Sequence, residues 1–201
     1  MKRIVLFLIL FGLVCGGQSG AALAQGNEIP LPQFKPGDTW SFKTPQGTSS
    51  RTVLRVEADG TVVMHSEIRS SRVSLDYNQR LTKNLDPLNS QGPTFNGGVV
   101  DYSYDPPACW MAPAPWTVGK EWSCNFVSTG YRGRTYPFTY SGKLDGMEKV
   151  TVPAGTFDAL RITLNAGSKW TFWYAPAVRY YIKSDTGNPI TSFELVQYSL
   201  K

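Results

Sequence analysis

Short runs of alternating apolar and polar residues, separated by closely spaced turn residues, dominate the chain after residue 25. Helical periodicity is hard to find there. The pattern predicts strands at residues 52–56, 61–64, 68–75, 99–104, 122–128, 135–144, 148–152, 157–164, 169–174, 178–184 and 191–200. These make roughly ten or more strands of an all-β fold. Such short connections exclude parallel crossovers, so we expect an antiparallel meander curled into a half-barrel, a barrel or a sandwich.

Turn residues mark the breaks between these strands. Ala58, Asp59 and Gly60 separate two alternating runs, and an Asp-Gly pair in that setting is a strong hairpin signal. Residues 84–98 are rich in Asn, Gly and Pro and are predicted to form a loop.

The stretch VPAGTF, at residues 152–157, raises the question of whether it grips a ligand or only turns the chain. Val150 and Val152 share one face of the preceding strand, and Leu160 and Ile162 share a face of the following one. A phosphate-binding loop would need a helix after the glycine, whereas the pattern here is that of a strand. We therefore predict a hairpin in which Gly155 takes a positive φ.

A short motif occurs twice. FKPGDTWSF at residues 34–42 and WTVGKEWSC at residues 116–124 both read aromatic-x-x-Gly-x-x-Trp-Ser. The pattern indicates a turn through glycine that starts a strand whose tryptophan enters the core. Two copies do not make a solenoid, and they favour two equivalent strand starts in one sheet. The alternative is that these tryptophans form a ligand platform.

The N-terminus has the organisation of a secretory signal peptide. Lys2 and Arg3 precede an apolar run at residues 4–15, which is too short to span a membrane comfortably, and the small residues Ala22 and Ala24 fit a cleavage site. We predict a Sec-type signal peptide over residues 1–24, cleavage after Ala24, and a single β-rich domain over residues 25–201. The protein is then periplasmic or secreted. Cys15 raises a lipoprotein alternative, which Val14 disfavours because that chemistry wants a small preceding residue.

Net charge gives little support for a nucleic-acid partner. The formal charge is +5, and the signal peptide removes two basic residues and no acidic ones. The remaining balance is compatible with weak attraction to an anionic envelope.

Cys109 and Cys124 would be the cysteines of the exported chain. An even pair in an exported protein predicts a disulfide. It would close a loop of about 15 residues, a constraint of roughly 3 kcal/mol in the chain-entropy model. The alternative is a pair of free thiols for redox chemistry or metal binding, but the spacing is not that of a Cys-x-x-Cys motif.

The C-terminal half resembles a widespread group of uncharacterised bacterial exported proteins. The matching pieces are VGKEW at residues 118–122, VPAGTFDALRI at residues 152–162 and WYAP at residues 173–176, in an order that recurs in that group. The resemblance covers about residues 112–200 and departs at Arg179, where the group often has glycine. It implies a half-barrel-like envelope domain similar in outline to periplasmic lipoprotein carriers, and it supplies no catalytic residue.

Signs of catalysis are weak. The one histidine, His65, lies on an alternating segment, and a Ser-His-Asp triad would have to include it. No Gly-x-Ser-x-Gly elbow occurs after the signal peptide. Ser66 and Glu67 are adjacent in sequence and point to opposite faces, so neither has an obvious role. We therefore expect no enzyme activity.

Metal ligands and paired carboxylates are equally sparse. One histidine and two cysteines expected to be oxidised argue against structural zinc. Asp101, Asp105 and Asp145 do not form a spaced calcium loop. Asp101, Asp105 and Glu121 are the best candidates for a glycosidase pair, with solvated surface charge as the favoured interpretation. We expect no cofactor and no metal.

Aromatic residues are the most informative feature. They crowd the region of the predicted disulfide, and Trp170, Phe172 and Tyr174 share one face of a predicted strand while Trp173 takes the other. They either fill the core or border an apolar cavity on a concave sheet face. The residues predicted to line or border a site are Tyr102, Trp110, Trp116, Trp170, Phe172 and Trp173.

These features favour a non-catalytic exported envelope protein that binds or carries an apolar or amphipathic ligand. Arg132 and Arg134 would offer charge to a phosphate or carboxylate headgroup at the mouth of a cavity. The alternative is a structural protein that docks another envelope component through a sheet edge or an aromatic loop. The expected partners are thus a lipid or other apolar small molecule, or an envelope protein, and not nucleic acid.

Overall fold

The structure is a computed structural model that describes residues 28–71, 74–93, 98–189 and 191–201. The predicted signal peptide, its cleavage site and Cys15 lie outside these residues. In the described ranges, no helix has the length and apolar character needed to cross a membrane.

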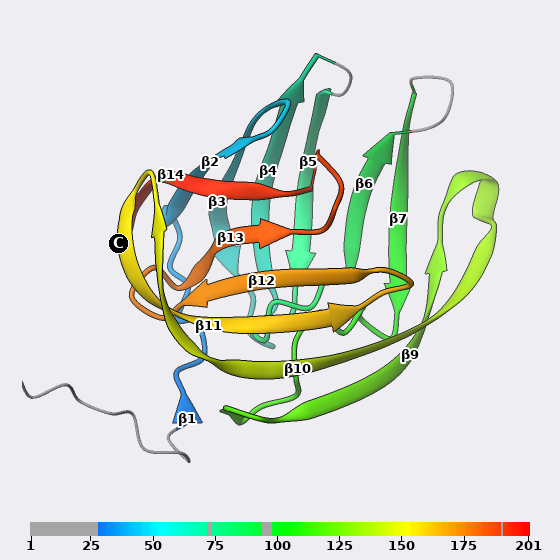
Figure 1. Ribbon diagram of the computed structural model, residues 1–201. Coiled ribbons are helices and arrows are strands. Elements are labelled where there is room, and N and C mark those ends of the chain that lie inside the picture. The colour runs from blue at the N-terminus through cyan, green and yellow to red at the C-terminus, as the bar shows by residue number, and fades with distance from the viewer. Residues whose placement is uncertain (1–27, 72–73, 94–97, 190) are drawn as a thin grey trace, which may run out of the picture.

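The fold is all-β, as predicted (Figure 1). Twelve strands form one antiparallel sheet in the order β5-β4-β3-β2-β14-β13-β12-β11-β10-β9-β7-β6. Their bounds are β2 Thr39–Thr44, β3 Gly47–Val56, β4 Val62–Ser70, β5 Ser74–Leu81, β6 Asn89–Pro93, β7 Val99–Asp105, β9 Glu121–Thr129, β10 Thr135–Val152, β11 Gly155–Asn165, β12 Lys169–Ala175, β13 Tyr180–Asp185 and β14 Phe193–Ser199. A separate pair joins β1 Glu28–Ile29 to β8 Trp116–Thr117, and the short helix η1 spans Tyr131–Gly133.

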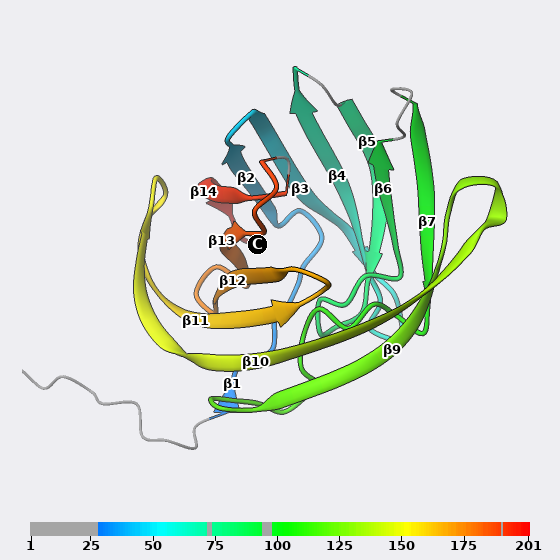
Figure 2. The same ribbon diagram turned by 45° about the vertical axis from the view of Figure 1, so that its right-hand side comes forward.

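The sheet curls into a nearly closed barrel (Figure 2). Its terminal strands β5 and β6 approach at one end, where a bridge joins Leu81 to Pro87 and the Leu88 N–H donates to the Arg80 carbonyl at 2.9 Å. The Asn89 side chain continues this pairing by bonding to the backbone of β5. Its Oδ1 accepts from the Arg80 N–H, and its Nδ2 donates to the Asn78 carbonyl. One amide side chain thus helps to hold the two sheet edges together.

Both copies of the repeated motif start a strand as predicted. Gly37 and Gly119 have φ values of +90° and +85°, a conformation that glycine adopts without a Cβ clash. Trp40 and Trp122 follow on β2 and β9, and both are buried in the main hydrophobic cluster. The two tryptophans are therefore core residues rather than a ligand platform.

Hairpin predictions are largely confirmed. The turn between β3 and β4 is closed by the Thr61 N–H, which donates to the Asp59 side chain. VPAGTF is a hairpin corner: Val152 pairs with Gly155, whose φ is +135°, and β11 follows without a helix. Val150, Val152, Leu160 and Ile162 are all buried.

Three strand predictions were wrong in detail. A predicted strand at 68–75 spans the end of β4 and the start of β5. The predicted loop at 84–98 contains β6, which is short and rich in turn residues but is paired with β7. The predicted break between 144 and 148 is only a bulge in β10, where Asp145 accepts from Arg161 Nε at 3.2 Å and Thr163 Oγ1 at 2.7 Å. Contacts from the neighbouring strand thus keep β10 continuous.

Arg179 keeps the glycine-like turn that the resemblance implies. Its φ is +60°, which is costly for a residue with a Cβ. Its guanidinium donates to Oδ2 of the fully buried Asp38 at 3.2 Å. Asp38 also accepts from the backbone N–H groups of Lys35 and Lys201, so this carboxylate joins the first turn, the β12–β13 turn and the C-terminus.

The disulfide between Cys109 and Cys124 is formed, with Cα atoms 6.5 Å apart. It fixes the segment before β8 to β9. Beside it, the Trp122 indole N–H donates to the Cys109 carbonyl at 3.2 Å.

Replacing Arg179 with glycine should lower the free energy of unfolding by roughly 2 kcal/mol. Glycine relieves the positive φ, but an unpaired buried Asp38 carboxylate costs more than that relief. Urea unfolding of the wild type and Arg179→Gly tests this, and equal or greater stability in the variant would show that the ion pair is dispensable.

Cys109 and Cys124 should resist a thiol reagent in the native protein until a reductant is added. Reduction should lower the free energy of unfolding by about 3 kcal/mol, because the unfolded chain regains the freedom of a closed loop. Thiol titration and unfolding with and without reductant measure both effects. Native thiols that react without reduction would contradict the pairing.

Candidate functional site

The inner face of the β9–β10 hairpin is aromatic and accessible. In the ladder between the strands, Tyr140 pairs with Cys124 and Phe138 with Phe126. Phe126 and Tyr140 are buried in the core cluster, so this face points into the barrel. Phe138 and Tyr136 lie on the same face, since strand residues two apart point the same way, yet they are 40% and 46% exposed. This end of the hairpin, the open end, therefore leaves the two rings uncovered.

The exposed rings are continuous with buried ones. Phe138 stacks on Phe126 with centroids 5.5 Å apart and an interplanar angle of 21°. Phe126 meets Tyr140 edge-on at 4.8 Å, and Tyr140 meets Trp170 at 6.0 Å. An aromatic surface thus runs from the open end, at Tyr136, to the packed interior.

Three of the predicted site residues meet at the deep end of this surface. Trp110 stacks on Phe172 with centroids 6.0 Å apart, and it meets Trp170 edge-on at 6.2 Å. Phe172 is buried, whereas Trp110 and Trp170 are partly exposed. Trp110 and Trp170 can border a ligand here, and the buried ring of Phe172 packs against both of them.

Tyr102 lies on β7, on the face that it shares with Tyr104, whose ring meets Phe126 edge-on at 5.8 Å, and it covers two glycines. A Cβ built on Gly130 would lie 2.6 Å from Tyr102 Cε1, and one on Gly92 would lie 3.0 Å from Cε2. The ring is partly buried and occupies the space that side chains at these two positions would fill.

The two remaining predicted site residues lie away from the aromatic surface. Trp116 is 0% exposed, and its indole N–H donates to the Ala112 carbonyl at 2.8 Å, so it is a core residue. Trp173 is on the outer face of β12, where its indole N–H donates to Glu148 and Lys183 lies 5.5 Å from its ring centroid.

Tyr136 and Phe138 were missed by sequence reasoning, although a signal was present. Residues 135–140 read TYPFTY, with aromatics at every second position. That alternation places three rings on one face of a strand. Of the tryptophans predicted as site residues, Trp116 is buried and Trp173 faces outward.

One polar group inside the barrel has unmet hydrogen-bonding capacity. The Tyr181 hydroxyl is buried and has no hydrogen-bond partner among the described residues. Burial raises the pKa of Tyr181 well above its ordinary value, so the group stays protonated. Buried hydroxyls are normally satisfied by protein, water or ligand.

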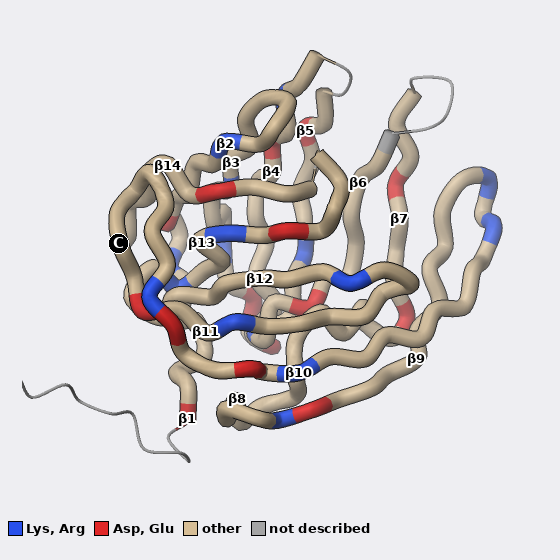
Figure 3. Tube along the Cα trace, viewed as in Figure 1, with Lys and Arg blue, Asp and Glu red and all other residues tan. Residues whose placement is uncertain are grey.

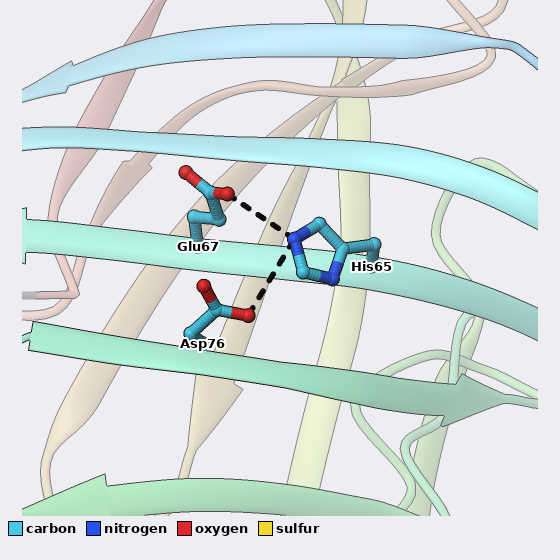
Figure 4. Close-up of side chains that lie close together, drawn as sticks. All are labelled: His65, Glu67 and Asp76. Carbon is cyan, nitrogen blue, oxygen red and sulfur yellow. Dashed lines mark hydrogen bonds and ion pairs between the residues drawn. The ribbon is translucent and has the colours of Figure 1, made fainter.

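His65, Glu67 and Asp76 form a cluster on the outer face of β4 and β5 (Figure 4). His65 Nε2 lies 3.2 Å from Glu67 Oε1 and 3.6 Å from Asp76 Oδ1. Because Glu67 is two residues after His65, the pair shares a face, which sequence reasoning overlooked. Arg69 already pairs with Asp76 at 2.8 Å and approaches Glu67 at 3.8 Å, so an internal cation offsets both carboxylates.

Three of the four carboxylates considered for calcium or glycosidase chemistry are engaged by neighbouring side chains. Asp101 accepts from Gln91, and Glu121 pairs with Lys143 at 2.8 Å. Asp145 is held by Arg161 and Thr163. In the described part of the chain, neither Asp101, Asp105 nor Asp145 belongs to a group of three metal-type ligands.

Asp86 is the carboxyl with the most perturbed titration. Burial raises its pKa to about 7, against the opposing effect of hydrogen bonds from the Met111 N–H at 2.9 Å and the Thr82 hydroxyl at 3.4 Å. These bonds fix the β5–β6 connection to the segment that carries the disulfide.

The Asp86 carboxyl should make stability depend on pH. A folded-state pKa above the unfolded value of about 4 adds stability that is present in acid and lost as pH rises toward 7. Asp86→Asn removes this component. The stability of the variant relative to wild type should therefore rise by roughly 2–4 kcal/mol between pH 4 and pH 8. Urea unfolding at both pH values measures it, and a pH-independent difference would contradict the assignment.

Similarity to known proteins was found in structure and not in sequence. No family model matches the sequence, and no curated protein matches it. A solved structure of a Bacteroides fragilis protein with a YmcC-like fold, assigned as exported, is similar to this chain at 11% identity and a TM-score of 0.46. The similarity covers 86% of this chain and 100% of the other.

Proposed function

We propose that this protein is a non-catalytic exported protein that binds or carries an apolar or amphipathic ligand on the inner face of its barrel. The observation that carries the proposal is the exposure of Tyr136 and Phe138 on a face whose neighbouring rings, Phe126 and Tyr140, are buried. Aromatic rings left half-exposed on a concave surface are typical of binding sites, because they lose water contact when a ligand covers them.

The depth of the aromatic surface supports an elongated ligand. The chain of ring contacts continues from Phe138 through Phe126 and Tyr140 to Trp170 and Trp110. An apolar segment laid over Tyr136 and Phe138 would leave a polar head at the open end, close to the basic tip of the hairpin. This division matches an amphipathic molecule.

Export is part of the proposal. The signal-like N-terminus favours a periplasmic or secreted protein. The Cys109–Cys124 disulfide favours the same conclusion, because such bonds persist in oxidising compartments.

A non-catalytic role fits the ionisable groups. His65 lies on the outer face of β4 among charged partners, away from the aromatic inner face. Asp86 is used to hold two loops together. A cofactor is not required for this role.

Docking of another envelope protein through a sheet edge is the alternative. Residues 135–140 of β10 pair with β9, and the pairing with β11 begins only at Ser141, so this stretch has one unpaired side among the described strands. Pro137 stands in the middle of it. Proline in a sheet places its missing N–H away from the ladder, which here removes a donor from the free edge. This disfavours strand addition and leaves the aromatic face as the better-supported site.

Phe138→Ser should weaken binding of the apolar fluorescent probe N-phenyl-1-naphthylamine about fivefold, because the exposed part of the ring contributes about 1 kcal/mol when covered. Fluorescence titration of wild type and variant measures the change.

Val127→Ser is the matched control. Val127 is 39% exposed on the outer face of the same hairpin, next to Phe126. Its substitution should change probe binding less than twofold. Equal losses in both variants, or none in either, would overturn the proposed inner-face site.

A further inference from the structure

The tip of the β9–β10 hairpin is a tight, internally bonded loop at the edge of the molecule (Figures 1 and 3). The Gly130 N–H donates to the Arg134 carbonyl at 3.0 Å, and the Gly133 N–H donates to the Gly130 carbonyl at 2.9 Å. These bonds fix the backbone of the loop, so its side chains are presented from a defined frame.

The side chains at this tip are basic and aromatic. Arg132 and Arg134 are exposed, Tyr131 is 51% exposed, and the Arg132 guanidinium carbon lies 5.0 Å from the Tyr131 ring centroid. In the described ranges, neither arginine forms an ion pair within 4.0 Å. From residue 122 to residue 144 the chain contains three basic residues and no acidic one.

The backbone at Arg132 is hard to explain by folding alone. Its φ is +57° and its ψ is +30°, a conformation that costs a residue with a Cβ of order 1 kcal/mol, and glycine would fit better. Unlike Arg179, it has no buried carboxylate partner among the described residues. A long basic side chain thus occupies a strained position that faces solvent.

We propose that this tip docks the protein on a surface of anionic phospholipid headgroups. Arginine forms paired hydrogen bonds with phosphate, and tyrosine is favoured at the depth of the headgroups, where one end of the ring is apolar and the other is wet. Since the hairpin carries no acidic side chain from residue 122 to residue 144, it adds no repulsion of its own from such a surface.

A lipid surface fits the tip better than a protein strand does. Strand addition along residues 135–140 is interrupted by Pro137, whereas headgroups need only the side chains of the loop. Asp101 and Asp105 are on β7, where Asp101 is held by Gln91 and Asp105 is paired in register with Val127. If the proposed function also holds, docking at the tip brings the open aromatic end of the barrel close to the bilayer.

Vesicle sedimentation tests the proposal with phosphatidylcholine vesicles that contain either no phosphatidylglycerol or about 30% of it. The wild type should bind the anionic vesicles, and raising NaCl from about 50 to about 300 mM should weaken this binding. Arg132→Gln/Arg134→Gln should reduce the partition coefficient about 25-fold, at about fivefold for each arginine near the surface.

Lys35→Gln/Lys83→Gln is the matched control, because it makes the same change in net charge at exposed sites away from the tip. It should lower partition less than twofold. Arg132→Gly adds a second check: it should leave the unfolding midpoint unchanged or higher while lowering partition about fivefold. Failure of the wild type to bind anionic vesicles, or equal losses in the two double variants, would overturn the proposal.

Binding of N-phenyl-1-naphthylamine separates this inference from the proposed function. The arginine double variant should bind the probe as the wild type does, because the probe is uncharged and has no headgroup for the arginines to contact. Loss of vesicle binding with intact probe binding supports docking by the tip. Loss of both would mean that the arginines act through the structure of the hairpin, which would contradict the proposal.

Discussion

The hydrogen bonding of β10 is the constraint on which the rest of the structure depends. Over residues 135–140 this strand pairs with β9, and from Ser141 it also pairs with β11. Where both neighbours are present, the inner side chains are covered and form the core. Where β11 has ended, the same inner face continues with Tyr136 and Phe138 exposed. The mismatch in strand length thus creates the open aromatic end.

This arrangement places a packed interior and a binding surface in one sheet. The buried rings of Phe126 and Tyr140 pack against the exposed ring of Phe138. The rigid base limits how far the exposed rings can move, which lowers the cost of ordering them around a ligand. The disulfide contributes to the same base, because Cys124 lies opposite Tyr140 in the β9–β10 ladder.

Much of the fold followed from sequence because it depends on local chemistry. Period-two alternation identified most strands and their faces, and Gly37, Gly119 and Gly155 marked turns that need a positive φ. The continuity of β10 was not predictable, because it is maintained by Arg161 and Thr163 of the neighbouring strand. β6 was missed because its composition is that of a loop and its pairing with β7 is what makes it a strand.

The site was harder to predict than the fold. Alternation tells which residues share a face, but it does not tell which face is inner or how deeply each residue is covered. Trp173 proved to be outward-facing and Trp116 fully buried for this reason. The exposure of Phe138 depends on where a neighbouring strand ends, and that is a property of the whole sheet. The ion pair of Arg179 could not be predicted from local sequence either. Its φ follows the turn motif, but its partner Asp38 lies 141 residues away.

The most direct test is mass spectrometry of an organic extract from the protein, purified under mild conditions, beside the same extract from Tyr136→Ser/Phe138→Ser. We expect an apolar or amphipathic molecule in near-stoichiometric amount with the wild type and a marked reduction with the variant. An extract from the wild type without such a molecule, or the same amount with both proteins, would contradict the claim that this aromatic face is a binding site.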